Sequence, residues 1–495
     1  MNAPVTNTAA PDRRSRWRGS LRRIGQLAAI GLIAIIFFLM VILFLNYRDR
    51  QILADAIAEA DRLDPGWRLV EILAKRSQIP DDENGALIIA ALCESDKPYD
   101  DWGMRNAGYN DHVLRSLTPC ERLPVAKATI LRAAMTSVEW DRHQARKLAN
   151  LPRGRFRIDW RGNPAFTIVP FQHMRLVANL LSYDARLRAE DSDIEGALQT
   201  IRAAINLSRY SHDEPSPLNY LAQISCMDAA LTSLERTLGQ GEAEDPALAA
   251  VQALLEDDDR EPHLLHCLRG ERATNDHWFA MVDDGRISME QYFATAALNK
   301  SANKSSLPQW LQELRDRLLP RHGLSSLPVE RAALLRYLTR TVEIAKLPDD
   351  EQWPAILEHS ATVKDQLLMT RIFAPAGTGK IFEAHLTHRA RVRMAITAVA
   401  AERFRMRHGR WPKALDELIP DLLPCAPRDP FASAPLQCLQ LPDGFSVSSV
   451  GRNRNDDGGD LDSNHPGTPG LDTGFRLWNP DKRRQPPAKA EEKKP

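Results

Sequence analysis

Residues 24–45 read IGQLAAIGLIAIIFFLMVILFL, and this stretch decides the first level of the fold. Gln26 is its only strongly polar side chain. Its 22 residues would extend about 33 Å as a helix, enough to cross a hydrocarbon core about 30 Å thick. Only a helix satisfies its own backbone polar groups in lipid. We therefore predict that residues 24–45 form a transmembrane helix in contact with the lipid bilayer.

The charges on either side of this stretch predict its orientation. Residues 1–23 contain one acid, Asp12, and six arginines: Arg13, Arg14, Arg16, Arg18, Arg22 and Arg23. The other flank offers only Arg48 and Arg50, with Asp49 between them. The positive-inside rule then predicts a single-pass protein of the inner (cytoplasmic) membrane. Its basic tail, residues 1–23, would be cytoplasmic and its body, from residue 47 on, extracytoplasmic.

A cleaved signal peptide is the alternative interpretation. The apolar region of a signal peptide is usually about 7–15 residues long and ends at a cleavage site of small residues. Here the run is longer and ends in Phe44-Leu45-Asn46-Tyr47-Arg48, which offers no such site. We therefore expect an uncleaved signal-anchor.

Composition indicates a globular body and excludes some functions. Hydrophobic residues make up 43% and charged residues 26% of the 495, and Lys+Arg and Asp+Glu both number 65. A chain without net charge has no overall attraction to nucleic acid, so no nucleic-acid partner is expected. Six cysteines without a CxxC spacing disfavour a disulfide scaffold and a thiolate zinc site. Cys425 and Cys438 flank a predicted turn and could pair.

Hydrophobic periodicity predicts a mainly α protein whose helical extracytoplasmic domain covers residues 47–380. Helices are expected over 51–75 with a break at 64–67, after a turn at 79–85, and over 121–150 and 170–190. They continue through 215–408, with breaks at 239–241, 307–308, 327–328 and 347–348. Alternating residues between 154 and 169 predict a short hairpin. Residues 176–210 have the small alanines of a tetratricopeptide unit but no second copy, so an ordinary helical hairpin is expected.

The composition changes after residue 408. Residues 409–480 are rich in Pro, Gly and Asp with short β-like runs, so 381–480 predict a small α+β C-terminal module that begins with a helix. The tail 481–495, DKRRQPPAKAEEKKP, has no apolar residue larger than Ala and predicts disorder.

Short motifs follow one another in this module in a particular order. After the helix come Trp411-Pro412, then 428–431 (RDPF), 445–451 (FSVSSVG), the acidic loop 453–462 (NRNDDGGDLD) and finally Trp478. This order resembles the head of the type II secretion major pseudopilin family, and the resemblance covers about 90 residues. It implies a calcium-binding loop and a place in a cell-envelope assembly.

The chain also departs from that family. A pseudopilin joins its head directly to its own membrane helix, which carries a prepilin-peptidase site and a conserved Glu. Here the predicted membrane helix lacks both and lies some 340 residues away. The run LDPGWRL…IPDDENGA over residues 63–86 resembles uncharacterised membrane-anchored proteins of planctomycete bacteria, a resemblance that implies no function.

The acidic loop is the candidate metal site. Asn453, Asn455 and Asp457 alternate before Gly458, as in the first half of a calcium loop. Further carboxylates come from Asp456, Asp460 and Asp462. Against calcium, the first ligand is Asn and position twelve is Asn464 rather than a bidentate Glu. The alternative is a solvated turn, which Asn, Asp and Gly also favour.

Other motifs carry no prediction of chemistry. Residues 377–380 (GTGK) lack the earlier Gly and the following Ser or Thr of a phosphate-binding loop, so no nucleotide is expected. His263, His266 and Cys267, and the pair His385 and His388, have helical spacing. No HExxH accompanies them, and GxSxG is absent, so packed or surface histidines are expected.

These observations favour a non-enzymatic, membrane-anchored interaction or structural protein of the cell envelope, with an envelope protein as partner. The alternative is an extracytoplasmic hydrolase whose site is assembled from residues far apart in sequence.

Overall fold

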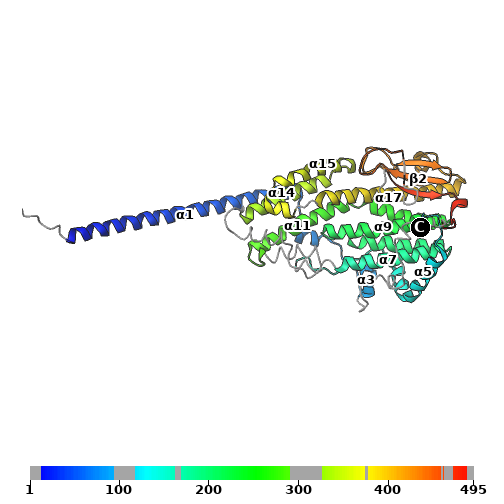
Figure 1. The fold of residues 1–495 in the computed structure, drawn as a ribbon, viewed down its shortest axis with the longest axis horizontal. Helices are drawn as coiled ribbons and strands as arrows, with labels where there is room; N and C mark the ends of the chain where they lie inside the picture. The colour runs from blue at the N-terminus through cyan, green and yellow to red at the C-terminus, as the bar shows by residue number, and fades with distance from the viewer. Residues whose placement is uncertain are drawn as a thin grey trace, which may run out of the picture.

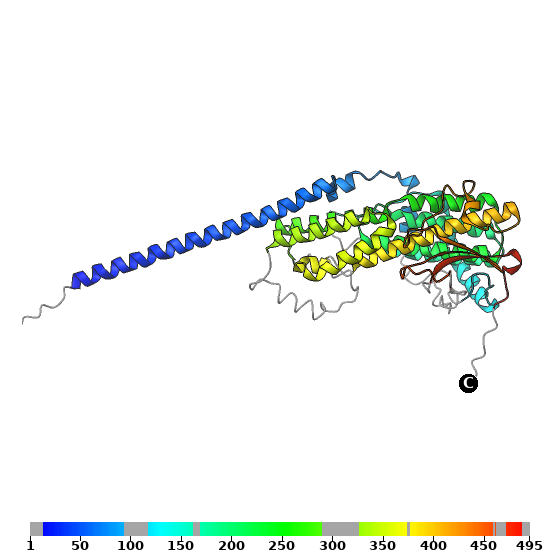
Figure 2. The same ribbon diagram turned by 90° about the horizontal axis from the view of Figure 1, so that it is seen from above.

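The computed structural model describes residues 13–93, 117–161, 169–289, 326–373, 377–458, 461 and 472–487. The protein is mainly helical with one small sheet near the C-terminus, as the sequence predicts. A long helix, α1 (Arg13–Leu63), projects from one end of an elongated body, and the sheet lies at the opposite end (Figures 1 and 2).

Helix α1 combines the apolar stretch and the first packed segment of the body. Among the described residues it is the one helix long and apolar enough to cross a membrane, and the most apolar part of it is not buried against the rest of the protein. Beyond it, Leu53, Ala56 and Ala60 pack in one buried cluster with Ala332 of α14 (Leu327–Ala345). The helix ends before Pro65, as expected because proline cannot continue the backbone hydrogen bonding.

The rest of the body is a bundle of helices that run mostly along its long axis (Figure 1). In chain order they are α2 (Leu69–Ala74), α3 (Gly85–Cys93), α5 (Val125–Ser137), α6 (Glu139–Arg146), α7 (Val169–Glu190), α8 (Ile194–Ser208), α9 (Pro217–Gln240), α10 (Asp245–Arg260), α11 (His263–Asp283), α14, α15 (Asp349–Ala361), α16 (Leu368–Phe373) and α17 (Gly377–His408). Helices α7, α8 and α9 pack on one another, and α17 packs on α9 and α10. The expected hairpin at 176–210 is confirmed as α7 and α8, with Ala185, Ala197 and Ala204 buried.

The sheet consists of three antiparallel strands in the order β1-β2-β3. The strands are β1 (Gln437–Leu441), β2 (Gly444–Ser449) and β3 (Thr473–Trp478). Val447 in the central strand is paired with Cys438 on one side and Phe475 on the other. β2 and β3 contact α17, and Phe445, Val447 and Leu477 belong to the same hydrophobic core as α7, α8 and α9. The C-terminal module therefore shares its core with the helical body.

The predicted hairpin over 154–169 is wrong in the part that the structure describes, because residues 154–161 form no strand. The side chain of Asn84 takes the place of a partner strand: its Nδ2 donates to the Arg155 carbonyl at 3.0 Å, and its Oδ1 accepts from the Arg155 N–H at 2.8 Å. The alternation has separate causes, since Phe156 and Trp160 are buried while Arg157 pairs with Asp81. Residues 162–168 lie outside the described residues, as does the expected break at 307–308.

The prediction of disorder is also wrong for the first part of the tail, residues 481–487. Arg483 is buried, and its Nη2 donates to both carboxylate oxygens of Glu402 at 2.9 Å. The backbone of Gln485 exchanges hydrogen bonds of 2.8 Å with the Cys120 carbonyl and the Arg122 N–H. Charge composition predicted solvation here, but a buried carboxylate on α17 provides the partner for the arginine. Residues 488–495 lie outside the described part of the chain.

Candidate functional site

The acidic loop is described only in part, since Asp460 and Asp462 lie outside the described residues. The other four predicted ligands form a compact turn. Asn453 Nδ2 donates to Asp457 Oδ2 at 3.0 Å, Asn453 Oδ1 accepts from the Asn455 N–H at 3.1 Å, and Asp456 Oδ1 accepts from the Gly458 N–H at 2.8 Å. Hydrogen bonds from the Gln437 side chain and from the Gly458 N–H lower the pKa of Asp456. In the described part of the chain, no three His, Cys, Asp or Glu side chains are placed to hold a metal ion.

A cluster of buried histidines is the most unusual chemical feature of the body, and we call His263, His385, His388, Asp258 and Tyr220 the histidine cluster. Its members come from four helices: Tyr220 from α9, Asp258 from α10, His263 from α11 and the other two from α17. All five are buried. A short break at residues 261–262 separates α10 from α11 and brings Asp258 next to His263. The spacing of three on α17 places His385 and His388 on one helix face.

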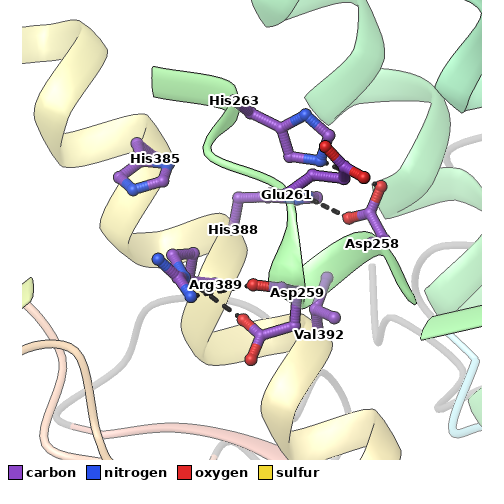
Figure 3. A pocket seen from close by; sticks show the side chains of 8 residues that line it. All are labelled: Asp258, Asp259, Glu261, His263, His385, His388, Arg389 and Val392. Carbon is purple, nitrogen blue, oxygen red and sulfur yellow. Dashed lines mark hydrogen bonds and ion pairs between the residues drawn. The ribbon is translucent and has the colours of Figure 1, made fainter. Parts of the chain in front are cut away.

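Two of the imidazoles share one carboxylate (Figure 3). His263 Nε2 lies 3.2 Å from Asp258 Oδ1, and His388 Nε2 lies 3.5 Å from Asp258 Oδ2. Burial opposes ionisation of Asp258, but attraction and hydrogen bonding from His263, with a further contribution from His388, bring its pKa below the usual value. Asp258 is therefore a buried carboxylate whose nearest partners are imidazoles rather than permanently charged guanidinium groups.

The third imidazole has a different partner. The Tyr220 hydroxyl lies 2.5 Å from His385 Nδ1, and the Tyr220 ring is 5.8, 5.9 and 6.4 Å from the rings of His263, His385 and His388. Burial, followed by repulsion from Arg389 and the neighbouring histidines, holds the pKa of His385 well below its usual value. Burial likewise raises the pKa of Tyr220. His385 is thus kept neutral by its surroundings.

The cavity beside the cluster is small. Its lining comprises Asp258, Asp259, Glu261, His263, His385, His388, Arg389 and Val392 (Figure 3). Its free volume is about 10 Å³, close to the least that holds one water molecule. The site as it stands can therefore hold protons and one water, but not an organic substrate.

Sequence reasoning found only part of this cluster. It singled out His263 and the pair on α17 and expected packed or surface histidines, and the structure places all three in the interior. It missed Asp258 and Tyr220, because nothing in the local sequence joins α9 and α10 to a helix that begins at Gly377.

The junction between α1 and the body is a second organised site. Asp64, just after α1, accepts hydrogen bonds from Arg269 Nε at 2.8 Å and from the fully buried Arg272. The guanidinium of Arg272 lies over the Trp67 ring, 5.1 Å from its centroid, and Trp67 Nε1 donates to Asp61 at 2.9 Å. These contacts fix the end of α1 to α11. At the start of the packed segment, the Ser326 hydroxyl donates to Asp49 at 2.6 Å.

No family model, curated protein or solved structure matches this chain. The resemblance of the C-terminal module to the pseudopilin head therefore stays a prediction.

Proposed function

We propose that this protein is a single-pass, membrane-anchored, non-enzymatic protein of the cell envelope that presents its C-terminal sheet to an envelope partner. The observation that carries the proposal is the continuity of α1. Its 51 residues extend about 77 Å without a break, and its last turns are packed on α14 and tied to α11. A body attached in this way keeps a fixed orientation to its anchor, which suits a scaffold.

The position of the sheet supports the choice of surface. The sheet lies at the end of the body opposite to α1 (Figures 1 and 2). With residues 24–45 in the bilayer, this end stands farthest from the membrane and is the part best placed to reach a partner. In our proposal the basic N-terminus is cytoplasmic and the body extracytoplasmic, because the arginines precede the apolar stretch.

Cys425 provides a test of sidedness, because it is the one exposed thiol among the six free cysteines. Burial raises the pKa of the others, to about 11 for Cys93 and Cys120 and to about 12 for Cys226 and Cys438, so they react slowly. A membrane-impermeant maleimide should label the full-length protein in intact spheroplasts. Cys425→Ser should abolish the labelling. Labelling only after lysis would place the body in the cytoplasm.

The same thiol tests the partner. A photo-crosslinker attached to Cys425 in native membranes should yield one recurrent envelope protein, identified by mass spectrometry. The matched control moves the probe to the base of the body, as Asp55→Cys in a Cys425→Ser background, where the same partner should not be captured. Equal products from both positions, or none from Cys425, would contradict the assignment of the distal end as the interface.

A calcium-stabilised head is part of the proposal. Its support is the alternation of oxygen-bearing side chains from Asn453 to Asp457 before Gly458. Calorimetry of the full-length protein with millimolar calcium should give heat that Asp456→Asn and Asp457→Asn together remove. Absence of heat from the unsubstituted protein would end the idea.

The histidine cluster is the one observation that favours the alternative, an extracytoplasmic hydrolase. Buried imidazoles beside a carboxylate are typical of acid–base sites. Against it, the cavity has room for about one water. Ester and amide turnover by the purified protein that is lost in both Asp258→Asn and His388→Gln would establish the enzyme and replace our proposal.

A further inference from the structure

The histidine cluster lies where two hydrophobic cores of the body meet. The larger core contains α17 from Leu386 onward together with α7 to α10 and the sheet. A smaller core contains Phe382 of α17, Tyr220 of α9, Leu264 of α11, Val342 of α14 and Ile356 of α15. His385 lies between Phe382 and Leu386, at the boundary of the two cores. The smaller core also leads to the anchor, because α14 packs against α1.

We propose that the histidine cluster is a proton-binding latch: neutral His385 holds the smaller core closed, and protonation of His385 releases the first turns of α17 from α9 and α11. The meaning of this latch for function rests on the proposed function. In that proposal the latch joins the helices next to the membrane anchor to the part of the body that carries the sheet. The latch itself can be tested without assuming a membrane or a partner.

The contact with Tyr220 explains why a proton breaks the closed state. The 2.5 Å contact of the hydroxyl to Nδ1 allows a neutral imidazole to accept the phenol proton. A protonated imidazole has no acceptor nitrogen, so the phenol would lose its partner in a buried place. His385 is also buried, and a cation without an adjacent carboxylate is costly there.

The charged groups around the cluster strengthen this effect. The titratable and charged groups around His385 lie on the elements packed against the cluster. They are Tyr220 of α9, Asp258 and Asp259 of α10, Glu261 of the following turn, His263, His266 and Cys267 of α11, Asp349 of α15, and His388, Arg389 and Arg393 of α17. Three of these four carboxylates are already engaged. Asp258 faces His263 and His388, while Asp259 and Asp349 pair with Arg389 and Arg393 at 2.9–3.2 Å. A proton on His385 would therefore meet the two arginines, and Glu261 is the one carboxylate among these groups for which the described structure shows no ion pair.

The direction of the pH dependence follows. Because the pKa of His385 lies below its usual value of about 6.5 in the closed state, the open state binds the proton more tightly. The closed state is then favoured above about pH 6.5, and opening increases by up to about tenfold for each pH unit below it until the lower pKa of the closed state is reached. Helix α8, which belongs to the larger core and carries none of these groups, should stay closed over the same range.

Hydrogen exchange of the full-length protein in detergent micelles tests the latch. After correction for intrinsic exchange rates, the opening equilibrium of the first turns of α17 should rise as the pH falls from 6.5 to 4.5, by up to about tenfold per unit. Amides of α8, in the larger core, serve as the internal reference. His385→Gln retains an acceptor for the Tyr220 hydroxyl but has no titrating group. The pH dependence of its opening equilibrium should therefore be weaker by about one proton. His408→Gln, at an exposed position of the same helix, should behave like the unsubstituted protein.

Two results would overturn the proposal. One is a flat pH profile for α17 in the unsubstituted protein, which decides the question even if His385→Gln does not fold. The other is a folded His385→Gln protein that opens as steeply as the unsubstituted one.

Discussion

Among the buried carboxylates that tie helices together, Asp184 and Asp258 have different kinds of partner. Asp184 of α7 lies between Arg142 and Arg146 of α6, at 2.8 and 2.5 Å, with Arg188 at 3.4 Å. Asp258 has the histidines of α11 and α17 instead. Guanidinium groups stay charged at any pH that a cell meets, whereas imidazoles do not. The clamp at Asp184 is therefore permanent and the one at Asp258 conditional.

The largest expected effect is the loss of the permanent clamp. Asp184→Asn leaves three partly buried arginines without their carboxylate, and we expect the free energy of unfolding to fall by about 3–5 kcal/mol. Burial opposes ionisation of Asp184, but the arginines lower its pKa, so its contribution is lost only as the pH falls below the usual value of 3.8. Urea unfolding of the full-length protein, followed by circular dichroism, should give the same loss at pH 5.5 and 7.5.

Asp191 provides the matched control for that substitution. It lies just after the same helix and pairs with Arg132 at 2.5 Å, but 45% of its side chain is exposed. Asp191→Asn should cost less than about 1 kcal/mol, as surface ion pairs do. Equal losses from the two substitutions, or a loss at Asp184 that depends strongly on pH in this range, would remove the distinction between permanent and conditional clamps.

Glu235 of α9 is another buried carboxylate, and no cationic side chain of the described residues is hydrogen-bonded to it. Its Oε1 accepts the backbone N–H of Arg476 on β3 at 2.8 Å, and burial raises its pKa to about 7. The folded state therefore holds a proton that the unfolded state releases, and stability falls as the pH rises from about 4.5 to 7. Glu235→Gln should stabilise the protein by about 3 kcal/mol above pH 7 and have little effect at pH 4.5. A gain that is equal at both pH values would show that ionisation is not the cause.

Loss of the conditional clamp at Asp258 should lower the free energy of unfolding less than loss of the clamp at Asp184. Its cost should also increase as the pH falls. Asp258→Asn should lower the free energy of unfolding by about 1–3 kcal/mol at pH 7.5, the usual cost of losing hydrogen bonds to a charged group. The cost should increase at pH 5.5, because a carboxylate contributes more beside a protonated imidazole than beside a neutral one. Urea unfolding at both pH values measures the difference. Identical costs would make Asp258 equivalent to Asp184.

The sequence predicted features that depend on neighbouring residues. The apolar stretch, the break at Pro65 and the helical hairpin with its small alanines were all readable, because periodicity and proline act locally. One clue to the interior was visible but not used. Asp184 stands where a tetratricopeptide unit usually has an apolar residue, and it is the carboxylate that three arginines surround.

The errors arose where the partner of a residue is distant in sequence. Arg155 looked like part of a strand, yet the side chain of Asn84 satisfies its backbone. Arg483 looked solvated, yet it binds Glu402 on α17. The histidine cluster is the same case, since Tyr220 and His385 are joined only by the packing of α9 against α17. Periodicity identifies the buried face of a helix, but not which helix covers it.

The smallest effect is expected at the junction between α1 and the body. There, too, arginines hold a carboxylate, since Arg269 and Arg272 bind Asp64. Trp67→Phe keeps a ring beneath the Arg272 guanidinium but removes the hydrogen bond from Nε1 to Asp61, which is 2.9 Å long. We expect a loss of about 1 kcal/mol, the same at pH 5.5 and 7.5, because Arg269 and Arg272 still hold Asp64. Urea unfolding measures it. A loss that grows at pH 5.5 would mean that protonation also loosens the junction of α1 with the body, and the clamps at Asp64 and Asp258 would then be of one kind.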